Sequence, residues 1–141
     1  MTHTLLRLFA GRRVVRLQNP HMDRRIQIVS SALETDFRRA WDIVQLGRLV
    51  NLSGSRLRHL FKAEMDQTPM QYLKVIRMRE AARLLRTTFL SVKEIMNRVG
   101  ISNESHFVHE FKKAHGLAPS KYRSALTVTV TAAVESGSMN E

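Results

Sequence analysis

The strongest constraint on the fold is an internal repeat with an offset of 50 residues. Over the 20 positions from 53 to 72, six residues recur 50 positions later. The recurring pairs are Ser55/Ser105, His59/His109, Phe61/Phe111, Lys62/Lys112, Pro69/Pro119 and Tyr72/Tyr122. Upstream, the offset falls to 49 residues, which pairs Leu46 with Ile95 and Val50 with Val99. A fixed period indicates duplicated structural units. We therefore expect two copies of one unit, the second with one extra residue.

Each copy has the pattern of two helices joined by a tight turn. In the first copy Asp42 is a suitable N-cap, and Ser53 or the residue after it begins the next helix. In the second copy Ser91 and Asn103 have these roles, and Gly100 suits the turn because glycine tolerates left-handed backbone. Apolar residues recur at helical spacing, and the alternation typical of strands is absent. The predicted fold class is all-α, with two helix-turn-helix subdomains.

Further helices are expected before and between the copies. Apolar residues recur at helical spacing after Asp23, namely Ile26, Val29, Leu33 and Phe37. Pro69 suits the start of the longest helix, over about residues 69–86, which links the subdomains. We expect a basic N-terminal arm over 1–22, a helical domain over 23–123 and a polar tail over 124–141, with the helix-turn-helix subdomains at about 42–63 and 92–114.

The charge of the chain narrows the class of partner. The 141 residues include 23 Lys and Arg against 12 Asp and Glu, a net charge of +11, which favours a polyanionic partner. There is no cysteine, so the chain has no disulfide framework, and we expect a cytoplasmic protein. No segment reaches the roughly 20 apolar residues of a membrane helix.

Helical phase places polar residues together on the second helix of each copy. In the first copy the outward stripe is Ser55, Arg58, His59 and Lys62. In the second it is Ser105, Val108, His109 and Lys112, flanked by Glu104 and His106. A helix fits the DNA major groove, where such side chains can bond to base edges or pack on a thymine methyl group. The two stripes predict a protein that binds double-stranded DNA.

Other classes of site have weaker support in the sequence. His106 and His109 are three residues apart, but the chain has no cysteine, the only carboxylates beside them are Glu104 and Glu110, and His59 is expected on a separate helix, so no metal is expected. No phosphate-binding glycine loop or nucleophile motif is present, so we expect neither an enzyme nor a cofactor. Three arginine pairs, Arg12-Arg13, Arg24-Arg25 and Arg38-Arg39, suit phosphates or a small anion, although solvated surface charge is the simpler interpretation.

The sequence resembles the DNA-binding domain of the AraC/XylS family of bacterial transcription regulators over about residues 23–123. The matching residues are Ser53, Leu57, Phe61-Lys62, Pro69, Tyr72, Arg77-Met78, Ala81, Leu84-Leu85, Ile95, Val99-Gly100-Ile101, Ser105, Phe107, Phe111-Lys112-Lys113, Gly116, Pro119 and Tyr122-Arg123. The resemblance implies about seven helices, with one recognition helix from each subdomain in the major groove. By position it implies base contacts from Ser55, Arg58, His59, Glu104, Ser105 and His109. It implies backbone contacts from Arg56, Lys62, His106, Lys112 and Lys113.

The chain departs from the family pattern at three positions. Met96 and Gly47 stand where a small residue, usually alanine, packs between the two helices, and the glycine costs about 1 kcal/mol of helix propensity. Ile101 replaces an aromatic residue after Gly100. The 22 residues before Asp23 are too few for a separate sensing domain, so a stand-alone, monomeric regulator is expected.

The sequence leaves two alternatives open. One is a non-specific architectural DNA-binding protein. The other is a protein-interaction module that acts on another regulator or on RNA polymerase, which is a candidate partner in either case.

Overall fold

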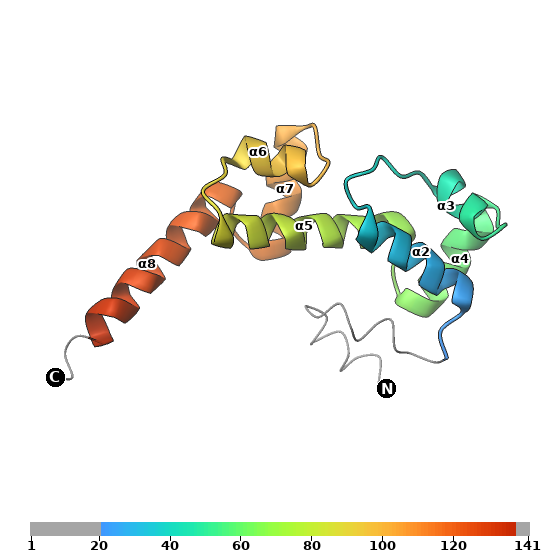
Figure 1. Cartoon of the computed structure of the whole chain (residues 1–141), viewed down its shortest axis with the longest axis horizontal. Helices are drawn as coiled ribbons and strands as arrows, with labels where there is room; N and C mark the ends of the chain where they lie inside the picture. The colour runs from blue at the N-terminus through green and yellow to red at the C-terminus, as the bar shows by residue number, and fades with distance from the viewer. Residues whose placement is uncertain (1–20, 138–141) are drawn as a thin grey trace. The chain divides into compact units, whose positions relative to one another are not determined.

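The computed structural model describes residues 21–137 of the chain, and side chains as far as residue 129. This part contains seven helices and no strand, which confirms the predicted all-α class (Figure 1). The helices are α2 (Arg24–Thr35), α3 (Ile43–Leu49), α4 (Gly54–Met65), α5 (Pro69–Thr87), α6 (Val92–Arg98), α7 (Glu104–His115) and α8 (Pro119–Gly137). Residues 1–20, most of the expected basic arm, lie outside the described residues. None of the described helices is long and apolar enough to cross a membrane.

The described residues form two compact units, each with its own helix-turn-helix. The first contains residues up to 33 and 41–69, and the second contains 34–40 and 70 onward. In the first unit α3 packs on α4. Its buried hydrophobic side chains and buried proline are Ile26, Val29, Leu33, Trp41, Leu46, Val50, Leu57, Phe61, Met65 and Pro69. Asp42 and Ser53 are the N-caps of α3 and α4, as predicted, and Asp42 forms a reciprocal capping box with Gln45.

The placement of Phe37 differs from the helical pattern expected for it. The helix α2 ends at Thr35, and the backbone N–H of Arg39 donates to the carbonyl of Asp36 in a turn. Phe37 therefore leaves the helical face of α2 and packs on the core of the second unit instead. Apolar spacing alone cannot detect this, because a turn after the helix redirects the side chain.

The second unit is built around a cluster of buried side chains from α5, α6 and α7. Its members are Met78, Ala81, Ala82, Leu84, Leu85, Ile95, Met96, Val99, Phe107 and Phe111. Ser91 and Asn103 are the N-caps of α6 and α7, as predicted. Tyr122 of α8 meets Phe111 edge-on, with ring centroids 5.3 Å apart. Arg123 donates to the carbonyl oxygens of Leu85 and Thr88, and so satisfies the C-terminal end of α5.

The turns of the two helix-turn-helix units contain equivalent backbone hydrogen bonds but different residues. In the first, the Leu52 N–H donates to the Gly47 carbonyl, and a Cβ at Gly47 would lie 2.3 Å from the Leu52 oxygen. In the second turn, Ile101 donates to Met96 at the same place, and Met96 is buried. Both hydrogen bonds join a residue to the one five positions earlier, so the extra residue of the second turn, Ser102, lies after this bond and before the N-cap Asn103.

Residues 124–137 continue the helix α8, whereas the sequence suggested a polar tail from residue 124. Three hydroxyl groups donate to carbonyls four residues earlier: Ser124 to Ser120, Thr127 to Arg123 and Thr129 to Ala125. The described side chains from 124 to 129 are mostly exposed, so this part buries little apolar surface. Helix propagation from the packed first turn explains the extension, since each added residue gains a backbone hydrogen bond.

Candidate nucleic-acid interface

The helix α4 presents a polar face because its apolar residues point into the first unit. Leu57, Phe61 and Met65 are buried, and the Ser53 hydroxyl accepts a hydrogen bond from the Arg56 N–H at 3.1 Å. The predicted contact residues of this helix are all exposed: Ser55, Arg56, Arg58, His59 and Lys62. The side chains of Arg58, His59 and Lys62 make no hydrogen bond or ion pair within residues 21–137, which leaves their polar groups available to a ligand.

The helix α7 has the same construction in the second unit. Phe107 and Phe111 are buried, and the Asn103 side chain accepts from the His106 N–H at 2.8 Å. The predicted contact residues Glu104, Ser105, His106, His109, Lys112 and Lys113 are all exposed. Val108, expected in the outward stripe, is half-buried.

The two polar faces differ in where they carry charge. The first turn of α4 contains no acid, and Arg56 and Arg58 lie in its N-terminal half. In α7 the first turn contains Glu104, and the basic residues Lys112, Lys113 and His115 are in the last turn. The N-terminal half of α7 therefore offers hydrogen-bonding groups but no Lys or Arg to neutralise a phosphate.

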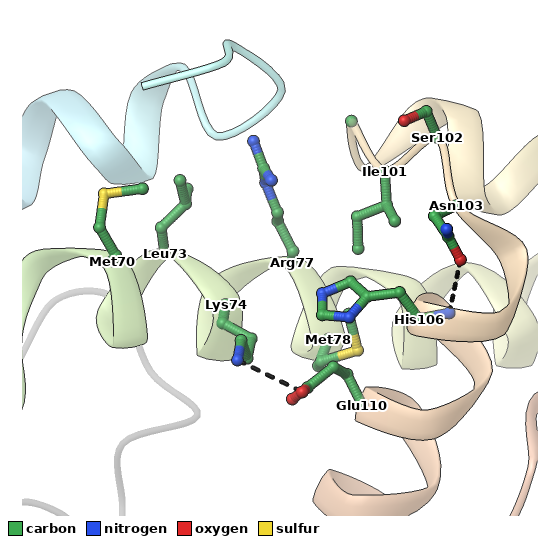
Figure 2. Close-up of a pocket in the computed structure, with 11 residues that line it drawn as sticks. Met70, Leu73, Lys74, Arg77, Met78, Ile101, Ser102, Asn103, His106 and Glu110 are labelled. Carbon is green, nitrogen blue, oxygen red and sulfur yellow. Dashed lines mark hydrogen bonds and ion pairs between the residues drawn. The ribbon is translucent and has the colours of Figure 1, made fainter. Parts of the chain in front are cut away.

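A cavity of about 350 Å³ lies beside α7 within the second unit (Figure 2). Its walls come from α5, the second turn and α7, and are formed by Met70, Leu73, Lys74, Arg77, Met78, Gly100, Ile101, Ser102, Asn103, His106 and Glu110. The Lys74 Nζ and Glu110 Oε1 atoms are 3.3 Å apart across this cavity. The cavity thus brings polar groups of α5 next to the flank of the second polar face.

Two charged groups of this cavity have shifted pKa values. Burial alone would raise the pKa of Glu110, but the hydrogen bond and charge of Lys74, with Lys113 and His106, lower it. Burial lowers the pKa of Arg77, which is half-buried. The sequence predicts no role for Lys74, and it indicates Glu110 only as a carboxylate near the histidines of α7. Glu110 lies four residues after His106 on α7, but its partner is known only once α5 and α7 are packed.

The described residues contain no group of three or more His, Cys, Asp or Glu side chains arranged to hold a metal ion. What the arrangement offers is two exposed helical faces, each of which follows a tight turn in a separate unit. Such helices can enter a DNA major groove and bond to base edges there.

Comparisons with known proteins point to one family. A family model described as a helix-turn-helix domain matches residues 46–125. The chain is 35% identical over 83 residues to the transcriptional regulator AlkR of Acinetobacter baylyi, covering 59% of this chain and 27% of AlkR. It is 32% identical over 111 residues to the arabinose operon regulatory protein of Escherichia coli, covering 75% and 37%. The chain thus spans about a third of the length of these relatives.

Solved structures agree with these relatives in fold. The C-terminal domain of the response regulator AraT from Geobacillus stearothermophilus matches with a TM-score of 0.71 and 28% identity, over 74% of this chain and 88% of that domain. The DNA-binding domain of AdpA, solved in complex with a target DNA, matches with a TM-score of 0.68 and 27% identity, over 76% and 96%.

Proposed function

The chain belongs to the AraC/XylS family of helix-turn-helix DNA-binding domains, and we propose that it is a sequence-specific, double-stranded DNA-binding transcription regulator. The observation that carries the proposal is the pair of exposed polar faces on α4 and α7, each fixed by a capped helix after a tight turn. One chain then supplies two base-reading helices, α4 and α7, for successive major grooves on one side of the duplex. We call these two helices the readers.

Each reader has residues suited to base edges and residues suited to phosphates. We assign base contacts to Ser55, Arg58 and His59 of α4 and to Glu104, Ser105 and His109 of α7. Arginine bonds to the O6 and N7 atoms of guanine, and glutamate accepts from the N4 amino group of cytosine. We assign backbone contacts to Arg56, Lys62, His106, Lys112 and Lys113. Phosphate neutralisation by the lysines and arginines supplies most of the affinity and makes it depend on salt.

We propose that the chain acts in the cytoplasm as a monomer, because it already contains two readers. RNA polymerase is the proposed protein partner. The N-terminal arm (1–22), the DNA-binding domain (23–123) and the segment after it (124–141) are the proposed divisions of the chain.

The test is selection of bound duplexes from a randomised pool of about 25 base pairs at about 150 mM salt, followed by sequencing. We expect two short motifs about one helical turn apart, without palindromic symmetry. One motif alone would mean that the second unit contacts only the DNA backbone. A palindromic motif would mean that the protein binds as a dimer. No enrichment would overturn the proposal in favour of an architectural protein or a protein-interaction module.

A further inference from the structure

The segment that connects α2 to α3 is part of the second unit, although most of α2 and all of α3 belong to the first. This connecting segment (residues 34–40) contains the adjacent arginines Arg38 and Arg39, both exposed. From the sequence, the pair suits phosphates or a small anion, and solvated surface charge is the simpler interpretation. Its position within the second unit raises the question of what holds it there and what it lies beside.

Arg77 of α5 fixes the backbone of the connecting segment. Its Nε atom donates to the Phe37 carbonyl at 2.8 Å, and its Nη2 atom donates to the Arg39 carbonyl at 2.9 Å. The pKa of Arg77 is lowered because its guanidinium is partly removed from water, and such a charge is costly to bury without hydrogen bonds. The Phe37 ring packs on the core of the second unit, and the Tyr72 hydroxyl donates to the buried Glu34 carboxylate. The segment is therefore held at both ends and in its middle.

The connecting segment lies directly against the turn that precedes α7. A Cβ at Gly100 would be 2.5 Å from the Arg38 carbonyl oxygen and 3.0 Å from the Arg38 Cα. Gly100 also has a φ of +82°, so glycine is required there for both backbone conformation and space. The helix α7 begins four residues later, at Glu104. Arg38 is thus anchored beside the N-terminal end of the second reader.

Arg38 supplies a positive charge near the start of α7, where the helix itself has none from Lys or Arg. The N-terminal half of α7 carries Glu104 and has no Lys or Arg, whereas the corresponding half of α4 carries Arg56 and Arg58. The Arg38 side chain is exposed and makes no hydrogen bond or ion pair within residues 21–137. The segment also contains two acids, Glu34 and Asp36, so its formal charges cancel, but Glu34 is buried against the Tyr72 hydroxyl and the two arginines are adjacent and exposed.

We infer that Arg38, with Arg39 beside it, is a DNA phosphate contact of the second unit, and that Arg77 is the positioning residue that sets its place. The inference rests on the proposed function. A major groove is about 12 Å wide, so the phosphates at its edges lie about 6 Å from the axis of a helix in its centre. An arginine anchored beside the start of that helix is suited to such a phosphate, because its planar donors match the phosphate oxygens.

The first test compares Arg38→Ala with Lys121→Ala, a matched loss of one exposed charge at the start of α8. Fluorescence anisotropy gives the dissociation constant of the full chain on the selected duplex and on a random duplex, from 50 to 300 mM KCl. For Arg38→Ala we expect about 5-fold weaker binding on both duplexes at 150 mM, and a salt slope smaller in magnitude by about 0.9. Lys121→Ala should change binding less than 2-fold.

A second measurement locates the contact on the DNA. Methylphosphonate linkages replace single phosphates with neutral groups across the half-site of the second unit. At one or two positions the substitution should weaken wild-type binding but have no further effect on Arg38→Ala, because the partner of the phosphate is already missing. Additive losses at every position, or wild-type affinity and salt slope in Arg38→Ala, would overturn the inference while leaving the proposed function intact. Failure of wild-type protein to discriminate between the two duplexes would instead overturn the proposed function.

The role of Arg77 is tested without a change in net charge. Lysine at position 77 cannot hold both carbonyls, so Arg77→Lys should bind DNA as weakly as Arg38→Ala. The double variant Arg38→Ala/Arg77→Lys should bind no more weakly than either, and additive losses would reject the positioning role. Circular dichroism melting reports whether the variants fold. If Arg77→Lys does not fold, the methylphosphonate scan of Arg38→Ala still decides the phosphate contact.

Discussion

At the scale of single residues, base contacts and phosphate contacts give different signatures in DNA binding. Both Arg58 and Lys62 are exposed on α4, but we assign the first to a base edge and the second to the backbone. We expect Arg58→Ala to cost about 1–3 kcal/mol on the selected site and to relax preference at one base pair. Lys62→Ala should weaken binding to all sequences by a similar factor and reduce the salt slope by about 1.

Competition binding against a panel of single-base variants measures this difference. Equal losses for Arg58→Ala on the selected site and on random DNA would show that Arg58 does not read a base. The Lys62 variant serves as the matched control, because it removes a cation from the same helix.

The ion pair between Lys74 and Glu110 gives a second prediction at this scale. The pKa of Glu110 is below its ordinary value of 4.5 in the folded protein, so the pair stabilises the fold above the unfolded pKa. This stabilisation is lost as the pH falls through the folded pKa. Because the pair is partly exposed, we expect Glu110→Gln to lower the free energy of unfolding by about 0.2–1 kcal/mol at pH 7.

Urea unfolding at several pH values tests this expectation. The stabilities of wild type and Glu110→Gln should converge as the pH falls below 4.5. A difference that stays constant over this range would mean that packing, rather than the charge of Glu110, accounts for the effect.

At the scale of helices and turns, Gly47 shows how packing can reverse a local propensity. Alanine is favoured over glycine within a helix by about 1 kcal/mol. A Cβ at position 47, however, would lie 2.3 Å from the Leu52 carbonyl oxygen, which belongs to backbone in the tight turn. We expect Gly47→Ala to lower the free energy of unfolding by about 1–2 kcal/mol, because the destabilisation from overpacking exceeds the gain in helix propensity.

Gly54→Ala is the control in the same unit. A Cβ there would lie 3.1 Å from the Cγ2 atom of Ile43, a side-chain contact that a small shift relieves, whereas the contact at Gly47 is with backbone. Thermal unfolding should show no loss of stability for Gly54→Ala and a clear loss for Gly47→Ala. An increase in stability for Gly47→Ala would mean that the first turn can move.

The elements of this fold were predictable where the signal was local. Asp42, Ser53, Ser91 and Asn103 are all N-caps in the structure, because a cap depends on a side chain and the backbone two or three residues after it. The exposed faces of α4 and α7 followed from helical phase. The contacts of Arg77 with residues 37 and 39 were not predictable, because they join segments about 40 residues apart.

At the scale of the whole molecule, the repeat predicts that the DNA site is asymmetric and therefore has a direction. The two units share a fold but present different side chains: Arg58 of α4 corresponds to Val108 of α7. If one chain supplies both readers, as proposed, we expect one molecule to occupy an asymmetric site of about 20 base pairs. Analytical ultracentrifugation with the selected duplex should give one protein per duplex.

Inversion of one half-site tests the same property through affinity. Because the order of the readers along the chain is fixed, the inverted half-site presents its bases in the wrong direction to its reader. Binding should fall toward the affinity for a single half-site, although length and composition of the duplex are unchanged. Two molecules per duplex, or stronger binding to the inverted arrangement, would mean that the two readers belong to different copies of the chain and that the regulator acts as a dimer.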